Sequence, residues 1–204
     1  VLDLCCGTGA MTGILARRGY DLTATDASSD MLAEAAAKLS QLSCAEPPLL
    51  LCQEASRLDL NDTVDAAVCC LDSINYLPPE ELDAVFARLA LFVSPGGLLI
   101  FDINSPERLR SLDGGTFVDE REGLLCLWRA QLDEQLQALV YGVDLFSRRG
   151  RLWSREQEEH VEYIHEPEQL LRRLEQAGFI HAVRRTDGPQ HELGREFYIA
   201  ERKQ

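Results

Sequence analysis

The chain has 204 residues, which suits one domain, or one domain with an insertion. It is 46% hydrophobic and 26% charged, so a disordered chain is excluded, and since no apolar run approaches the length of a bilayer span, no membrane partner is expected. The 34 Asp and Glu residues outnumber the 20 Lys and Arg residues, and the resulting net charge of −14 argues against a nucleic-acid partner held through its phosphates.

Seven cysteines are present, an odd number, and none of them forms a C-x-x-C pair. Zinc sites are typically built from such closely spaced thiolates, so no metal site is expected. Most of the cysteines lie in apolar segments, where Cys behaves as a small hydrophobe, which favours reduced thiols and a cytoplasmic location. The chain begins at Val1 inside a predicted strand, so we expect the natural N-terminus to lie upstream.

Strands and helices alternate through the first half of the chain. Apolar runs predict five buried strands, at residues 1–5, 22–25, 49–52, 65–71 and 98–103. Helical spacing of apolar residues predicts helices at 10–18, at 30–42 with Ser29 as its cap, and from residue 78 to the turn at 94–97. Such alternation is typical of a parallel sheet with right-handed crossovers.

The pattern changes after the fifth strand. From 116 to 165 no helical period is visible, and apolar residues recur at every second position, which predicts strands at 124–132, 136–146 and 152–164. We interpret this segment as an antiparallel meander inserted into the α/β domain. A helix at 167–177 and two strands, at 179–185 and 196–202, then close the chain.

The segment at residues 1–9, VLDLCCGTG, carries the strongest functional signal. Gly7 and Gly9 allow a sharp turn and close approach of a ligand to the backbone, and a helix begins directly after them. Asp26 ends the second strand, where an acid can accept both ribose hydroxyls. Strand, glycines, helix, strand and acid at this spacing predict a nucleoside site. A dinucleotide fingerprint has the form G-x-G-x-x-G, whereas here the third glycine, Gly13, comes one residue too late. This spacing argues against a nicotinamide-dependent oxidoreductase.

At these residues the chain resembles the class I S-adenosylmethionine-dependent methyltransferases. Their first motif is an acid followed by glycines at every second position, which Asp3, Cys5, Gly7 and Gly9 nearly repeat, with Cys5 where glycine is commonest. The segments 70–76 (CLDSINY) and 101–105 (FDINS) resemble a bacterial small-molecule branch that is similar to the aminosugar N-methyltransferases.

The resemblance implies a Rossmann-like α/β fold, with a doubly wound and mostly parallel seven-stranded sheet whose last strand is antiparallel. It also implies three parts: a cofactor-binding core at 1–105, an inserted β-sheet at 116–165 that roofs the acceptor pocket, and a final helix and hairpin at 166–204 that complete the core sheet. S-adenosylmethionine would be the methyl donor, S-adenosylhomocysteine the product and a small molecule the acceptor, with no metal.

The resemblance also implies cofactor-binding roles. Asp3 would hold the methionine end and Asp26 the ribose, with the backbone of Cys5, Gly7 and Gly9 beside the cofactor. Toward the adenine, the implied residues are Met31 and the turn after the third strand, at Glu54 and Ala55. The Leu71 carbonyl would face the cofactor's amino group.

The candidates for acceptor binding or catalysis are His160, Asp72 and Tyr76. Asp72 and Tyr76 follow the fourth strand, where the family places acceptor residues. His160 would share a strand face with Glu162 in the roof and could act as a base, although a histidine beside the acidic run 156–159 is also typical of a solvated surface. Trp128 and Tyr163 suit either the sheet core or the acceptor pocket.

The sequence therefore predicts methyl transfer to N or O of a small molecule. Two alternatives remain open at this point: an RNA or protein methyltransferase, and a protein that binds S-adenosylmethionine without catalysis. No [N/D]-P-P-[Y/F] motif of amide or nucleobase methylation follows the fourth strand, and no Pro-Cys nucleophile is present, which favours the small molecule.

Overall fold

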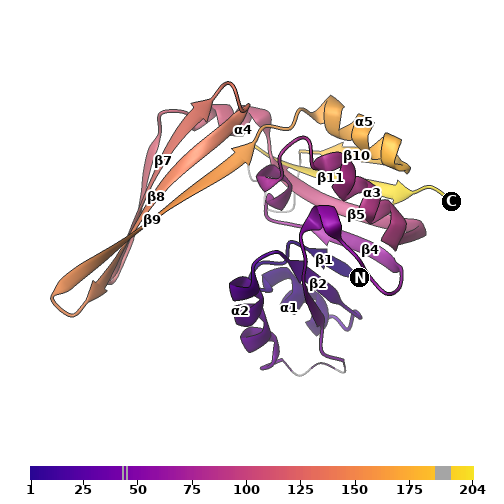
Figure 1. The fold of residues 1–204 in the computed structure, drawn as a ribbon, viewed down its shortest axis with the longest axis horizontal. Coiled ribbons are helices and arrows are strands. Elements are labelled where there is room, and N and C mark those ends of the chain that lie inside the picture. The colour runs from indigo at the N-terminus through magenta and orange to yellow at the C-terminus, as the bar shows by residue number, and fades with distance from the viewer. Residues whose placement is uncertain (43, 45, 187–193) are drawn as a thin grey trace.

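The chain folds into two β-sheets, and the computed structural model describes residues 1–42, 44, 46–186 and 194–204. Figure 1 shows a core that carries the helices and a second sheet whose far end projects away from the core. The core sheet has seven strands in the order β10-β11-β5-β4-β1-β2-β3. The pairs among β1 to β5 are parallel, and β11 runs antiparallel to β5. The predicted fold class is confirmed.

The core strands are β1 (Leu2–Leu4), β2 (Thr23–Asp26), β3 (Leu49–Cys52), β4 (Val64–Cys69), β5 (Val93–Asn104), β10 (Phe179–Arg185) and β11 (Arg195–Arg202). The helices are α1 (Ala10–Arg17), α2 (Ser29–Leu39), α3 (Leu82–Phe92), α4 (Pro106–Ser111) and α5 (Pro167–Ala177), with short 3-10 turns η1 (Ala55–Arg57) and η2 (Ser73–Tyr76). No helix of the described residues is both long and apolar enough to cross a membrane.

The inserted sheet has four antiparallel strands in the order β6-β7-β8-β9. They are β6 (Thr116–Arg121), β7 (Leu124–Asp133), β8 (Ala138–Arg149) and β9 (Leu152–Tyr163). The predicted meander contained only the last three. Strand β6 was not predicted. All six of its residues are exposed, so its sequence shows no alternation of apolar and polar residues.

Helices cover both faces of the core sheet. Leu2 and Leu4 belong to the main apolar cluster with residues of α3 and α5, whereas Ala24, the register partner of Asp3, packs against Leu32 of α2. Because alternate residues of a strand point to opposite faces, α2 lies on the face opposite to α3 and α5. This is the doubly wound arrangement.

Several predicted boundaries were wrong. The fourth strand ends at Cys69 rather than at Leu71, and three other differences have a clear local cause. Helix α2 begins at Ser29 and ends at Leu39, and the cap is Ser28, whose hydroxyl accepts from the Met31 amide at 3.3 Å. Helix α3 begins only at Leu82, because the residues from Pro78 form a turn first. Strand β5 begins five residues earlier than predicted, because the Pro-Gly-Gly segment is part of the strand. Its pairing with β4 shifts register there, between Val64 and Ala66.

Buried polar residues fasten the inserted sheet to the core. Asn75 in η2 is fully buried. Its side-chain amide donates to the Tyr163 carbonyl of β9 at 3.0 Å, and its side-chain oxygen accepts from the backbone amide of Asn104 in β5 at 2.9 Å. Two residues after β9, the buried His165 ring places Nε2 3.1 Å from the Ile74 carbonyl. Since a carbonyl only accepts, Nε2 carries the proton and donates it.

The buried His165 makes stability depend on pH. Burial lowers the pKa of His165 below its usual 6.5, so the unfolded chain binds this proton more readily than the folded chain. The stabilising contribution is therefore present above pH 6.5 and is lost as pH falls from there toward the folded pKa. Over this range the unfolding free energy falls by at most about 1.4 kcal/mol per pH unit.

We expect His165→Gln to remove this dependence. Urea unfolding at pH 7.5 and 5.5 should show a smaller loss of unfolding free energy in the variant than in the wild type. His181→Gln, at an exposed histidine, controls for loss of an imidazole. Equal losses in the wild type and His165→Gln would contradict the assignment.

Candidate active site

The loop after β1 has left-handed backbone at every second residue. Cys5, Gly7 and Gly9 have φ of 56°, 53° and 75°. Glycine adopts this conformation without strain, whereas a residue with a Cβ pays roughly 1–2 kcal/mol. The geometry explains why glycine suits all three positions, and it makes Cys5 a strained residue. At Gly9 a Cβ would also come within 3.0 Å of the Ala35 Cβ in α2.

Asp26 fixes this loop against the end of β2. One carboxylate oxygen accepts from the Gly7 amide at 2.8 Å, and the other accepts from the Ser28 amide at 2.9 Å. A Cβ on Gly7 would meet nothing within 4 Å, so open space lies beside the loop at this residue. The Asp26 carboxylate therefore sits at the carboxyl end of β2, beside a loop that is open to a ligand at Gly7.

Asp3 lies beneath the loop rather than at its surface. Its side chain is buried, and one carboxylate oxygen accepts from the Thr12 hydroxyl of α1 at 2.5 Å. Burial raises the pKa of Asp3, which the hydrogen bond from Thr12 partly offsets. Its contact with the methionine end stays a prediction.

The other predicted cofactor residues lie at the same edge of the sheet. Met31 is in the first turn of α2, and its side chain is exposed. Glu54 and Ala55 follow β3, where the Gln53 amide donates to the Asp26 carbonyl at 3.0 Å. Leu71 follows β4, the other neighbour of β1, and is also exposed. The structure thus brings all nine predicted residues to the carboxyl ends of β1 to β4.

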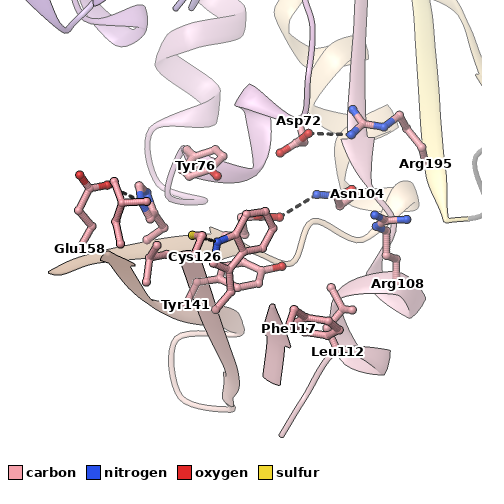
Figure 2. Close-up of a pocket in the computed structure, with 15 residues that line it drawn as sticks. Asp72, Tyr76, Asn104, Arg108, Leu112, Phe117, Cys126, Tyr141, Glu158 and Arg195 are labelled. Carbon is pink, nitrogen blue, oxygen red and sulfur yellow. Dashed lines mark hydrogen bonds and ion pairs between the residues drawn. The ribbon is translucent and has the colours of Figure 1, made fainter. Parts of the chain in front are cut away.

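Asp102 at the end of β5 holds the segment after β4. Leu71 and Asp72 have φ of 63° and 54°, and both of their amides donate to the Asp102 carboxylate, at 2.8 and 3.1 Å. Arg195 of β11 pairs with the same carboxylate and also with Asp72 at 2.9 Å (Figure 2). A bidentate carboxylate and a shared guanidinium therefore set where Asp72 points.

A cavity of about 730 Å³ lies between this segment and the inserted sheet. His160, Asp72 and Tyr76 all line it, so the structure brings the three catalytic candidates together. Trp128 lines it as well, whereas Tyr163, on the other face of β9, does not. Figure 2 shows that core residues such as Asp72 and Asn104 face the sheet residue Tyr141 across this space.

His160 contacts both walls of the cavity. Its Nε2 lies 3.1 Å from a Glu158 carboxylate oxygen, and its ring meets the Tyr76 ring edge-on with centroids 6.3 Å apart. The pKa of Tyr76 is raised to about 12 by burial and then by the charge of Glu162. His160 therefore lines the cavity while its side chain stays well exposed, so its catalytic role and its interpretation as a surface residue both remain predictions.

Sequence reasoning did not select Asn104, Tyr141 or Glu162 for the cavity. Glu162 is buried and accepts from the Asn104 side-chain amide at 2.9 Å. The sequence held a signal for two of these residues. Glu162 shares one strand face with positions 158 and 160, and Asn104 ends the FDIN segment at the carboxyl end of β5, where ligands bind in such sheets.

Comparison with known proteins agrees with this geometry. Residues 1–97 match the model of a family described as a methyltransferase domain. The structure of an S-adenosylmethionine-dependent methyltransferase from Clostridium acetobutylicum ATCC 824 is 30% identical with a TM-score of 0.86, over 100% of this chain and 83% of that one. The chain belongs to the S-adenosylmethionine-dependent methyltransferases.

Two further relatives are similar over most of the methyltransferase chain. YqeM of Bacillus subtilis (strain 168), named as a methyltransferase, is 29% identical over 187 residues, which are 90% of this chain and 74% of YqeM. The sugar N-methyltransferase KedS8 from Streptoalloteichus sp ATCC 53650 is 23% identical with a TM-score of 0.84, over 100% of this chain and 79% of that one, and shows the shared fold.

The loop of the methyltransferase fits the cofactor that the family name implies. The open space at Gly7 admits a ligand against the backbone, Asp26 has carboxylate oxygens for hydroxyl donors, and Met31 and Leu71 offer exposed apolar side chains at the same edge of the sheet. No group of three or more His, Cys, Asp or Glu that could hold a metal occurs in the described ranges.

Replacing Asp26 tests the proposed ribose contact. Asp26→Asn keeps one acceptor for the loop but removes the charge, and it should weaken S-adenosylhomocysteine binding by about 1.5–3 kcal/mol in a calorimetric titration. Asp30→Asn, which removes an exposed carboxylate in the first turn of α2, is the matched control. An unchanged affinity in Asp26→Asn would remove the ribose assignment.

Replacing Arg195 tests the support of the segment after β4. Arg195→Met leaves Asp72 and Asp102 without their shared cation in a largely buried site, and the free energy of unfolding should fall by about 3 kcal/mol. Arg121→Met, which breaks the exposed pair with Asp119, should cost less than about 1 kcal/mol. Denaturant unfolding measures both, and equal losses would contradict the role given to Arg195.

Proposed function

We propose that this methyltransferase transfers a methyl group to N or O of a small molecule bound in the cavity between the core and the inserted sheet. The observation that carries the proposal is the position of this cavity of about 730 Å³, which begins at Asp72, one residue after Leu71 at the proposed cofactor site. Its volume lies in the range that suits small-molecule ligands, and its walls come from both sheets.

The cofactor, when bound, supplies an activated methyl group on a sulfonium. The protein then has to align the acceptor behind that methyl group and exclude water. The inserted sheet is suited to both tasks, because Tyr141, Val143 and Leu145 of β8 line the cavity from the side opposite the core. A net charge of −14 further disfavours an RNA acceptor.

The lining favours a nitrogen acceptor. Glu158, Glu162 and Asp72 place carboxylates around the cavity, among the aromatic rings of Tyr76 and Tyr141. Carboxylates and aromatic faces both attract ammonium groups. Two cations, Arg108 and Arg195, also line the cavity, and Arg195 is paired with Asp72 and Asp102. In support, the names of the similar KedS8 and of rat glycine N-methyltransferase specify transfer to nitrogen.

The test is transfer of labelled methyl from S-adenosylmethionine to matched amine and alcohol pairs. The pairs are benzylamine with benzyl alcohol, cyclohexylamine with cyclohexanol, and D-glucosamine with D-glucose. Bulk tRNA and a mixed protein extract are assayed beside them. Transfer only to tRNA or protein, or cofactor binding without any transfer, would contradict the proposal.

Filling the cavity should block transfer without disturbing the cofactor. Leu145→Trp adds bulk to the cavity wall and should reduce turnover of the best acceptor at least about tenfold, because misplaced reactants react slowly. S-adenosylhomocysteine affinity by calorimetry should stay within about twofold. Phe146→Trp, at the next residue and on the opposite face beneath the Arg155 guanidinium, should keep both properties. A large loss of cofactor affinity in Leu145→Trp would show that the inserted sheet also builds the cofactor site.

A further inference from the structure

The cavity contains several groups that could take a proton, and their surroundings differ. Asp72 is paired with the Arg195 guanidinium at 2.9 Å, which stabilises its charged form. Tyr76 has a pKa raised to about 12 and keeps its proton near neutral pH. His160 is bonded to Glu158, and both of these side chains are well exposed to solvent. None of the three is a buried base without a cation.

Glu162 is a buried carboxylate that forms no ion pair within 4 Å in the described part of the chain. The residue is 6% exposed, and its carboxylate accepts from the Asn104 side-chain amide at 2.9 Å and shares a hydrogen bond with the Tyr76 side chain. Burial raises the pKa of Glu162 and the charge of Asp72 adds to the rise, while the hydrogen bond from Asn104 and the charges of Arg108 and Arg195 partly offset it. A carboxylate in these surroundings is a better proton acceptor near neutral pH than an exposed one.

Asn104 fixes the position of the Glu162 carboxylate. Its amide nitrogen must face the carboxylate, because only that end of the side chain can donate. Its other end, Oδ1, is fully buried and has almost no surface open to the cavity. Asn104 therefore holds Glu162 in place, and the Glu162 carboxylate is the member of this pair that we expect a ligand to meet.

We infer that Glu162 is the catalytic base that deprotonates an amine acceptor, while the Asn104 side-chain amide holds its carboxylate in place. The inference rests on the proposed function and adds the residue that prepares the acceptor. The carboxylates of Glu162 and Asp72 beside the Tyr76 ring suit a cationic ammonium, whereas a hydroxyl group brings no charge to them.

The proton and electrons balance as follows. The acceptor enters as an ammonium, and one N–H proton passes to a Glu162 oxygen, which leaves a neutral carboxylic acid and a nitrogen lone pair. The lone pair forms the new bond to the methyl carbon while the carbon–sulfur bond breaks and leaves its electron pair on sulfur. The methylated ammonium then departs, and Glu162 returns its proton to water.

The first test is binding, which does not require turnover. In the complex with S-adenosylhomocysteine, benzylamine should bind at least about tenfold more tightly than benzyl alcohol at pH 7.5, because only the amine brings a positive charge to Glu162. Glu162→Gln should abolish that preference. Glu159→Gln, an exposed residue on the opposite face of β9, should retain it. Equal binding of amine and alcohol to the wild type would overturn the inference.

The second test is the pH profile of transfer to the amine that is turned over fastest. At pH 7, Glu162→Gln should lose about 10²-fold or more in kcat, with S-adenosylhomocysteine affinity unchanged. Its turnover should then rise about tenfold per pH unit as free amine replaces the ammonium form, since no base is needed for an amine that arrives deprotonated. A merely structural Glu162 would give a loss that is the same at every pH.

Other charged and titratable groups also face Glu162, and the control variant keeps all of them. They are Asp72 and Tyr76 of η2, Arg108 of α4, Tyr141 of β8, Glu158 and His160 of β9, and Arg195 of β11. Wild-type turnover in Glu162→Gln at pH 7, or a loss that does not change between pH 7 and 9, overturns the inference. Transfer to the alcohols alone would also overturn it, while the proposed function would stand.

Discussion

The Asp102 carboxylate is the point on which the two halves of the site depend. It is buried at the end of β5, accepts from the amides of Leu71 and Asp72, and pairs with Arg195 of β11. These contacts hold two consecutive residues in left-handed backbone, which neither adopts readily without support. One buried carboxylate therefore joins the segment after β4 to β5 and β11, and it positions residues 70–76 beside the cavity.

A second set of buried contacts joins the inserted sheet to that segment. Asn75 bridges η2 to β5 and β9, and His165 bonds the Ile74 carbonyl. The inserted sheet is therefore attached to the core through η2, the same turn that presents Tyr76 to the cavity. This attachment keeps the walls of the cavity in register although its residues come from parts of the chain far apart in sequence.

The sequence predicted the fold class well because its signals are local. Apolar runs, helical stripes and the VLDLCCGTG turn each reflect neighbouring residues, and the structure brings the predicted cofactor residues to one edge of the sheet. What the sequence could not show are pairings between distant segments. The Arg195–Asp72 pair and the Asn75–Tyr163 bond connect residues 123 and 88 positions apart. Nor could it show that Glu162, within an acidic strand, is buried while Glu158 is exposed.

The segment at residues 70–76 also links the two proposed ligand sites. Leu71 lies beside the proposed cofactor site, and Asp72 and Tyr76 line the cavity proposed for the acceptor, so one short turn joins the two. Because consecutive α-carbons are only about 3.8 Å apart, a shift of this turn would move both contacts together. The contacts of Asp102 and Asn75 oppose such a shift from two sides. In the proposed function, buried polar side chains of the core thus hold the turn that would align donor and acceptor, while the inserted sheet contributes the shape and chemistry of the opposite wall.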